Sequence, residues 1–583
     1  MLHTLTRSLR ENKGPALVTV LLSALEVVFE IVIPLFMSNL IDFGIEGGSM
    51  AAVWKFGAFL LLLAAFQLST GVLAARIAAR ASVGFAANLR EDMYNNVQTF
   101  AFSNIDKFST ASIVTRLTTD TTNVQNAFQM LMRMAIRAPV MLIFSMIVSF
   151  RISRDISMTF LIILPILALA LFFIIRSVFP VFTRVFRTYD ELNNVVQENV
   201  RGIRVVKSFN QERHEIGKFG AISERIYKDF SKGERLITLN APLMQFCIYT
   251  CMIVISWLGA KAIIASGNDP ALGLTTGNLT ALITYTMQIL SSLMMLSMVF
   301  AMLTISLSSA RRIAEVLEER SDIPQPEQPV MTVHDGAVDF DHVSFVYASK
   351  ADKKVLDDID LHIRSGETIG IIGGTGASKS SLVQLIPRLY DVTGGKLTLG
   401  GVDVRDYDLD TLRGAVAMVL QKNELFSGTI AENLRWGNEN ATDEQLRHAC
   451  KLACADGFIS AMPDGYDTHI EQGGTNVSGG QKQRLCIARA LLKKPKVLIL
   501  DDSTSAVDTR TDAQIQQALS TYIPDTTKII IAQRISSVQN ADRIVVLDDG
   551  HIDAVGCHDE LLRTCEIYRE VYESQQKGGE DDA

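Results

Sequence analysis

Long apolar runs recur through the first half of the chain and stop near Arg320. Each of the six runs is long enough to supply the roughly 20 residues that an α-helix needs to cross a bilayer. They cover residues 15–43, 54–78, 127–150, 157–180, 241–265 and 277–305. Long basic stretches of helical pattern separate the second run from the third and the fourth from the fifth. This pattern predicts a polytopic α-helical membrane domain of six transmembrane helices with long cytoplasmic extensions.

The pattern changes after Arg320, where Pro324, Pro326 and Pro329 prevent a helix from continuing. Beyond them, short β-branched runs such as "ETIGIIG", "KVLILD" and "KIIIAQ" alternate with helical stretches. That alternation is typical of buried, mostly parallel strands in an α/β domain. The expected domains are an amphipathic elbow helix at 1–14, a transmembrane domain at 15–320, a linker at 321–335, an α/β domain at 336–574 and an acidic disordered tail at 575–583.

Composition and charge bear on the protein's ligands and on its orientation in a membrane. The chain is 48% hydrophobic and 20% charged with a net charge of −8, so nothing points to nucleic acid. The basic stretches predict that both termini and the α/β domain lie in the cytosol, because positive charge favours the cytoplasmic side. Arg151 and Arg154, in a short outer loop, run against that rule. We expect a multi-pass membrane protein.

The stretch "IIGGTGASKSSL" lies between a strand-like run and a helical run. It fits the phosphate-loop pattern G-x-x-x-x-G-K-[ST], except that Ser378 replaces the second glycine. Backbone N–H groups at a helix N-terminus bind phosphates, Lys379 would neutralise them, and the Ser380 hydroxyl would ligate Mg²⁺. The α/β domain is therefore expected to be a P-loop nucleotide-binding domain. Its predicted ATP-binding loop is Gly373, Gly374, Thr375, Gly376, Ala377, Ser378, Lys379, Ser380 and Ser381.

Other motifs complete a nucleotide site. Asp501 ends the strand "KVLILD", and with Ser380 and Gln421 it is a candidate Mg²⁺ ligand. Tyr347 is placed to stack on a base. In "NVSGGQKQRL" a second helix N-terminus can bind an anion. With no partner lysine equivalent to Lys379, that motif would close over another chain's phosphate; it comprises Ser478, Gly479, Gly480 and Gln481.

Together and in this order, these motifs resemble those of bacterial type IV ATP-binding cassette (ABC) exporter half-transporters. "RLTTDTTNVQ" and "RGIRVVKSFNQE" also resemble that family's cytoplasmic coupling segments. The resemblance implies two nucleotide domains joined head to tail, with each ATP held between one chain's phosphate loop and the other chain's signature motif. It implies that Asp508 crosses this interface, and that ATP drives the membrane domain between inward- and outward-facing forms.

Several positions depart from the family's pattern. Asp502 stands where the family has a glutamate that polarises water, and Gln533 stands where it has a histidine. Gln472 replaces a usual glutamate ahead of the signature. With Ser378, these departures make the chain similar to the degenerate-site subunit of heterodimeric multidrug exporters. Its own site would then be slow, while its signature motif completes the partner's hydrolytic site.

The sequence says less about which substrate is transported than about the nucleotide site. Glu26 and Glu30 lie one turn apart in the first membrane segment, where carboxylates are costly and usually face a cavity or a partner. They would either attract cationic amphipathic substrates or form an interhelical bond. Further cavity candidates are Gln245, Gln288 and Met295. Two alternatives stay open: a homodimeric lipid or drug exporter in which Asp502 suffices as the base, and a nucleotide-gated regulator that does not pump.

Overall fold

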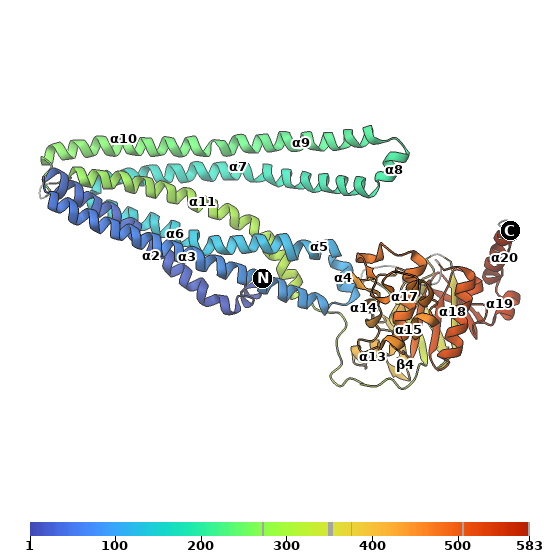
Figure 1. Cartoon of the computed structure of the whole chain (residues 1–583). Coiled ribbons are helices and arrows are strands. Elements are labelled where there is room, and N and C mark those ends of the chain that lie inside the picture. Colours follow the sequence, from blue (N-terminus) through green and yellow to red (C-terminus); the bar gives the residue numbers. More distant parts are fainter. Residues whose placement is uncertain (271–272, 348–353, 375, 504–506, 581–583) are drawn as a thin grey trace. The chain divides into compact units, whose positions relative to one another are not determined.

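The computed structural model describes residues 1–270, 273–347, 354–374, 376–503 and 507–580 (Figure 1). The chain folds as two compact units. The first unit comprises Met1–Gln98 and Thr110–Glu319, and the second comprises Thr99–Ser109 and Arg320–Ala583. The short stretch before Thr110 thus packs with the C-terminal part of the chain.

The first unit is built almost entirely of long helices. Within the described residues, six helical segments are long and apolar enough to cross a membrane, as the sequence predicted. In chain order the helices are α1 (Leu2–Arg7), α2 (Lys13–Asn39), α3 (Met50–Gln98), α5 (Thr110–Thr115), α6 (Thr121–Ile152), α7 (Arg154–Arg201), α8 (Ile203–Ser208), α9 (Glu212–Thr238), α10 (Asn240–Ser266) and α11 (Thr276–Glu318).

The elbow expected at 1–14 is not one helix. Helix α1 ends at Arg7, a 3₁₀ turn covers Arg10–Asn12, and α2 begins at Lys13. Arg10 has a positive φ of 39°, which breaks the helical path. The chain therefore changes direction between α1 and α2, before the first membrane span.

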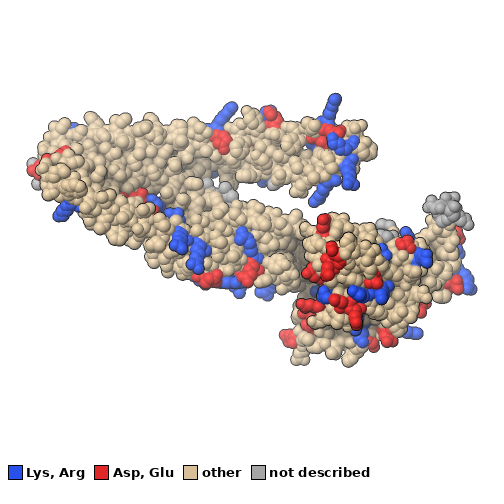
Figure 2. Space-filling model, viewed as in Figure 1, with Lys and Arg blue, Asp and Glu red and all other residues tan. Residues whose placement is uncertain are grey.

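Buried side chains hold α2, α6 and α11 together. Val27 and Ile31 of α2 pack with Met141 of α6 and Tyr285 of α11. The Tyr285 hydroxyl donates to the Ile31 carbonyl over 2.6 Å, which satisfies a polar atom that would otherwise be buried alone. Outward-facing positions of the spans are apolar and exposed, and Figure 2 shows few charged side chains along them. This surface suits lipid contact.

Within the described residues the second unit contains three sheets, the smallest of which pairs β7 (Gly428–Thr429) with β8 (His469–Ile470). A six-stranded sheet has the order β12-β11-β3-β10-β9-β6, parallel except for the edge strand β12. Its strands are β3 (Thr368–Gly373), β6 (Val416–Val419), β9 (Val497–Asp501), β10 (Thr527–Ile531), β11 (Arg543–Asp548) and β12 (His551–Gly556). An antiparallel sheet, β2-β1-β4-β5, comprises β1 (Val338–Phe345), β2 (Leu356–Ile363), β4 (Gly394–Leu399) and β5 (Val402–Asp403). The expected parallel strands are confirmed.

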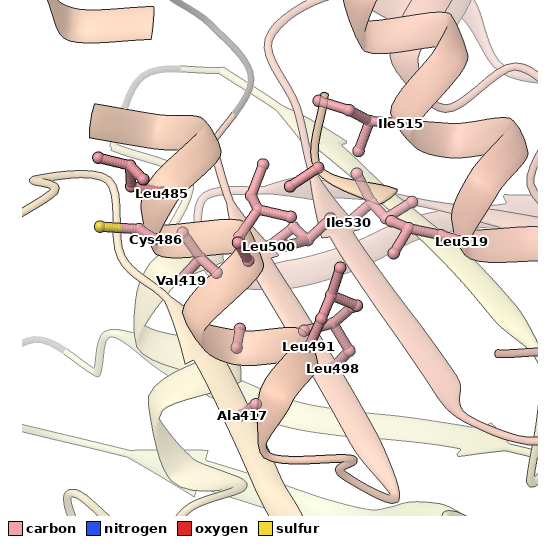
Figure 3. Packing of buried hydrophobic residues seen from close by; sticks show 14 of the residues in the cluster. Ala417, Val419, Leu485, Cys486, Leu491, Leu498, Leu500, Ile515, Leu519 and Ile530 are labelled. Carbon is pink, nitrogen blue, oxygen red and sulfur yellow. The ribbon is translucent and has the colours of Figure 1, made fainter. Parts of the chain in front are cut away.

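Helices cover the larger sheet and bury its apolar residues. Leu500 of β9 and Ile530 of β10 lie in one core with Leu485 of α17 and with Ile515 and Leu519 of α18 (Figure 3). Burying each such side chain stabilises the fold by about 1.5–3 kcal/mol. The helices of this unit are α4 (Phe102–Phe108), α12 (Lys379–Leu385), α13 (Leu409–Ala415), α14 (Ile430–Arg435), α15 (Asp443–Leu452), α16 (Asp456–Ser460), α17 (Gly479–Leu492), α18 (Thr509–Tyr522), α19 (His558–Thr564) and α20 (Glu566–Glu580).

The disordered tail expected at 575–583 is wrong over its first part, because α20 continues to Glu580. The sequence "EIYREVYESQQKGGE" is rich in good helix formers. Tyr568 is fully buried, and Val571 and Tyr572 pack against the same core. This apolar stripe anchors a helix whose acidic composition suggested a solvated tail.

Candidate nucleotide-binding site

The phosphate loop connects β3 to α12. Gly373 ends β3, and a Cβ there would lie 2.1 Å from the Leu547 carbonyl oxygen of the neighbouring strand, so only glycine fits. Lys379 starts α12, and its Nζ donates to the carbonyls of Gly373 and Gly374, each over 2.8 Å. Burial lowers the pKa of Lys379, although Asp501 and Asp502 oppose the shift. The lysine is therefore fixed at the mouth of the loop.

Ser378 has the backbone conformation that the family's glycine provides. Its φ is 65° and its ψ is 20°, in the left-handed region, where a side chain costs roughly 1–2 kcal/mol. Gly376 is also left-handed, with φ of 89°. The expected loop residue Thr375 lies outside the described residues, whereas Ala377 is buried beneath the loop.

Tyr347 lies beside the start of α12. Its hydroxyl shares a 2.7 Å hydrogen bond with Ser381 Oγ, and the residue is 42% exposed. The ring packs edge-on against Tyr390, with centroids 5.1 Å apart. A rigid, partly exposed aromatic face next to a phosphate loop can stack on a base.

Asp501 and Ser380 meet at the base of the loop. Burial raises the pKa of Asp501, and a hydrogen bond from Ser380 works in the opposite direction. A buried carboxylate beside a hydroxyl is a set of hard oxygen donors, so these two residues fit Mg²⁺. Gln421, the third candidate ligand, instead directs its amide nitrogen at Asp502 Oδ2 over 3.4 Å.

The two main departures from the family's pattern meet on one oxygen atom. Gln533 Nε2 donates to Asp502 Oδ2 over 2.7 Å, and Gln421 approaches the same atom. Asp502 is 9% exposed and has φ of 48°. Burial raises the pKa of Asp502, and the two amides work against that shift. The oxygen thus has both lone pairs engaged by protein groups.

The signature motif begins α17. Ser478 is its N-cap and accepts from the Gln481 N–H, while Gln481 Oε1 accepts from the Ser478 N–H over 2.9 Å, a complete capping box. Ser478 and Gly479 are exposed, and Gly480 is half-buried. The helix N-terminus therefore faces solvent and can accept an anion. Asp508 caps α18 by accepting from the Thr511 N–H over 2.9 Å, which gives it a structural role of its own.

A charged cluster lies within the helices of the first unit. Arg137 of α6 binds Glu26 over 2.8 Å and Glu30 over 2.6 Å, both on α2. Gln288 of α11 donates to the Glu30 carbonyl over 3.2 Å. Sequence reasoning missed Arg137, although an arginine inside the third apolar run was a signal that a carboxylate partner lies nearby.

This cluster forms one wall of a pocket of about 190 Å³. Its other residues are small or flexible: Ala138, Met141, Met287, Ser291, Ser292 and Met295. Of the cavity candidates, Glu30, Gln288 and Met295 line this pocket, and Glu26 binds Arg137 behind it. Gln245 is exposed on α10 and is not among the residues that line this pocket, so its role stays a prediction.

In the second unit, helix α4 packs against the nucleotide domain. Tyr390 donates to Asp106 over 3.0 Å, and its ring lies 6.0 Å from that of Phe102. Asn104 donates to the Arg320 carbonyl over 3.0 Å. Helix α4 is therefore fixed to the nucleotide domain at Tyr390, next to Tyr347.

Comparison with known proteins assigns the family. Residues 16–294 match the ABC transporter transmembrane region, and residues 356–505 match the ABC transporter domain. An uncharacterized ABC transporter ATP-binding protein of Bacillus subtilis, YfiB, is 35% identical over 561 residues, 96% of each chain. The chain belongs to the ABC transporter family. One membrane domain and one ABC domain in a single chain make it a half-transporter, as the sequence predicted, and a multi-pass membrane protein.

Other similarities concern relatives of this half-transporter. The ATP-dependent lipid A-core flippase of Desulfotalea psychrophila is 31% identical over 519 residues, 88% of this chain and 89% of the flippase. A bacterial Atm1-family ABC exporter solved with ATP bound superposes with a TM-score of 0.82 at 23% identity, over 97% of this chain and 99% of that one. The half-transporter therefore has the exporter fold, and such proteins function as dimers that bind and hydrolyse ATP.

Proposed function

We propose that this half-transporter is one subunit of a heterodimeric exporter that moves amphipathic compounds out across the bacterial cytoplasmic membrane by alternating access. Its phosphate loop forms a slow ATP site, and its signature motif completes the partner's hydrolytic site. Both termini and the nucleotide domain lie in the cytosol. The observation that carries this proposal is the hydrogen bond from Gln533 to Asp502 Oδ2.

The chemistry behind the slow site concerns proton transfer from water. Asp502 is one methylene shorter than the family's glutamate, and a displacement of about 1 Å at a reacting centre can cost ~100-fold in rate. Gln533 cannot take up or carry a proton near neutral pH, because an amide has no titratable group there. Both amides also contact one of the two carboxylate oxygens of Asp502, Oδ2.

The remaining residues suit nucleotide binding. Tyr347 would stack on adenine, and Lys379 would pair with the terminal phosphates. Ser380 and Asp501 would hold Mg²⁺, which neutralises phosphate charge when bound. On the opposite face of the dimer, the Ser478 helix N-terminus would bind the terminal phosphate of the partner's ATP, with Asp508 crossing the interface.

The test restores the family's residues. In the purified heterodimer, with the partner's own site inactivated, Asp502→Glu/Gln533→His should raise residual ATP turnover about 100-fold. Ser378→Gly serves as a matched control, because it relieves backbone strain without altering the proton chemistry. Unchanged turnover in the double variant, or full-rate turnover and transport by this chain as a homodimer, would overturn the proposal.

A homodimeric lipid exporter is the second candidate, favoured by the 31% identity to a lipid A-core flippase. The charged cluster argues for cationic amphipathic cargo instead. Two carboxylates and one guanidinium leave a formal charge of −1 at a pocket that methionines also line, and methionine adapts its shape to varied ligands. Glu30→Gln should weaken binding of a cationic dye about tenfold while leaving a neutral analogue unaffected. Equal losses for both would favour the lipid alternative.

A further inference from the structure

Helix α20 reaches the loop that carries Gln533. The Gln575 side chain lies against this loop and uses both ends of its amide. Its Oε1 accepts from the Ile535 N–H over 2.9 Å, and its Nε2 donates to the Gln533 carbonyl over 2.7 Å. The amide thus binds the backbone on both sides of Arg534. The side chain of Gln533, whose backbone carbonyl accepts from Gln575, donates to Asp502.

The helix is anchored well enough to act as a fixed support. Tyr568, fully buried, packs in the same core cluster as Ile535 and Val538. The Tyr568 hydroxyl is also 2.7 Å from His558 Nδ1. Helix α20 is therefore held in place at Tyr568, and Gln575 lies about two turns further along the same helix.

The loop is held on its other side as well. Ser537 Oγ donates to Asp512 Oδ2 of α18 over 2.6 Å. Asp512 is itself nearly buried, and its N–H donates to the Asp508 carbonyl at the start of that helix. The loop from Gln533 to Ser537 is thus fixed between α20 and α18, and Gln575 binds the backbone of Gln533, the residue that contacts Asp502.

We propose that Gln575 is a positioning residue for the nucleotide site. By binding the backbone at Gln533 and Ile535, it holds the Gln533 amide on Asp502 and makes the C-terminal helix part of the machinery that retains ATP. This inference rests on the proposed role of Gln533 beside the terminal phosphate. It goes further because it gives the C-terminal helix α20 a role in how long nucleotide stays bound.

The test compares Gln575→Ala with Gln576→Ala in the full heterodimer. Gln576 is the same residue type, exposed, one position along the same helix. Hydrogen exchange should accelerate at the Ile535 amide in Gln575→Ala only, because that N–H loses its acceptor. ATP photo-crosslinked to this chain after a chase should decline about tenfold faster, the effect expected for two lost backbone hydrogen bonds. The KM for ATP should match that of Gln576→Ala.

Gln575→Glu supplies a second variant if the alanine variant folds poorly. Its carboxylate can still accept from Ile535 but repels the Gln533 carbonyl, so nucleotide loss should accelerate while Ile535 stays protected. Unchanged nucleotide retention in both variants overturns the positioning role. If retention changes but Asp502→Glu/Gln533→His leaves turnover unaltered, the positioning role stands and the slow-site proposal fails.

Discussion

Removing Arg137 is the sharpest test of the membrane domain. Arg137→Met keeps an unbranched, flexible side chain but deletes the guanidinium and its charge, which leaves Glu26 and Glu30 facing one another across one helical turn. The side chains of Arg137, Glu26 and Glu30 are 25%, 11% and 23% exposed, so water screens them only in part. We expect this variant to be markedly less stable than the parent protein.

The magnitude follows from the contact distances. At an effective dielectric constant of about 20, a 2.8 Å contact between unit charges corresponds to about 6 kcal/mol of gross Coulomb energy. Desolvation cancels much of this gain, and removing one partner of a buried pair costs about 3–5 kcal/mol net. Because Arg137 and Glu30 are each partly exposed, about 3 kcal/mol is expected, a Tm decrease of roughly 5 °C.

The assay is thermal unfolding of the purified protein in lipid nanodiscs. Glu26→Gln/Glu30→Gln/Arg137→Met is the matched control, because it removes all three charges and should recover most of the lost Tm. A Tm for Arg137→Met equal to the parent's would refute the reasoning. So would a triple variant as unstable as the single one, because the loss would then come from packing rather than charge.

Three further predictions concern the nucleotide domain. Gly437→Ala should cost about 2 kcal/mol, because its Cβ would lie 2.0 Å from a carbonyl oxygen of α17, whereas Gly414→Ala, with open space around it, should leave the Tm unchanged. Tyr390→Phe loses the bond to Asp106, so transport per ATP consumed should decrease in proteoliposomes while ATP binding is retained. Burial raises the pKa of Asp502, and the carboxyl must be deprotonated to act as a base. Single-turnover cleavage at this site should therefore be present above that raised pKa and lost as the pH falls through it. The loss should occur at a higher pH than it would for an ordinary aspartate.

Much of the fold followed from local patterns. The runs that became β3, β9 and β10 are apolar on both faces, as strands covered by helices on either side must be. The six spans followed from length and hydropathy alone. Helix α20 did not, because its acidic and glutamine-rich composition hid a stripe of tyrosines that only the packed core explains.

The site was predictable where a motif is contiguous and not where distant segments meet. The loop from Gly373 to Ser381 is one segment, so its position follows from its own sequence. Gln421 lies 81 residues from Asp502, and its placement on that carboxylate rather than beside Asp501 depends on tertiary structure. The pairing of Arg137 with Glu26, 111 residues apart, likewise depends on which helices are neighbours.

Helix α3 is 49 residues long, which at 1.5 Å per residue is about 74 Å. A bilayer's hydrocarbon core is only about 30 Å thick, so over half of this rod stands outside it. A rotation of about 10° at a pivot in the bilayer would move the end at Gln98 by roughly 8 Å, for an arm of about 45 Å. A small change in tilt among the spans thereby becomes a large stroke where the chain enters α4, without any bending of the helix.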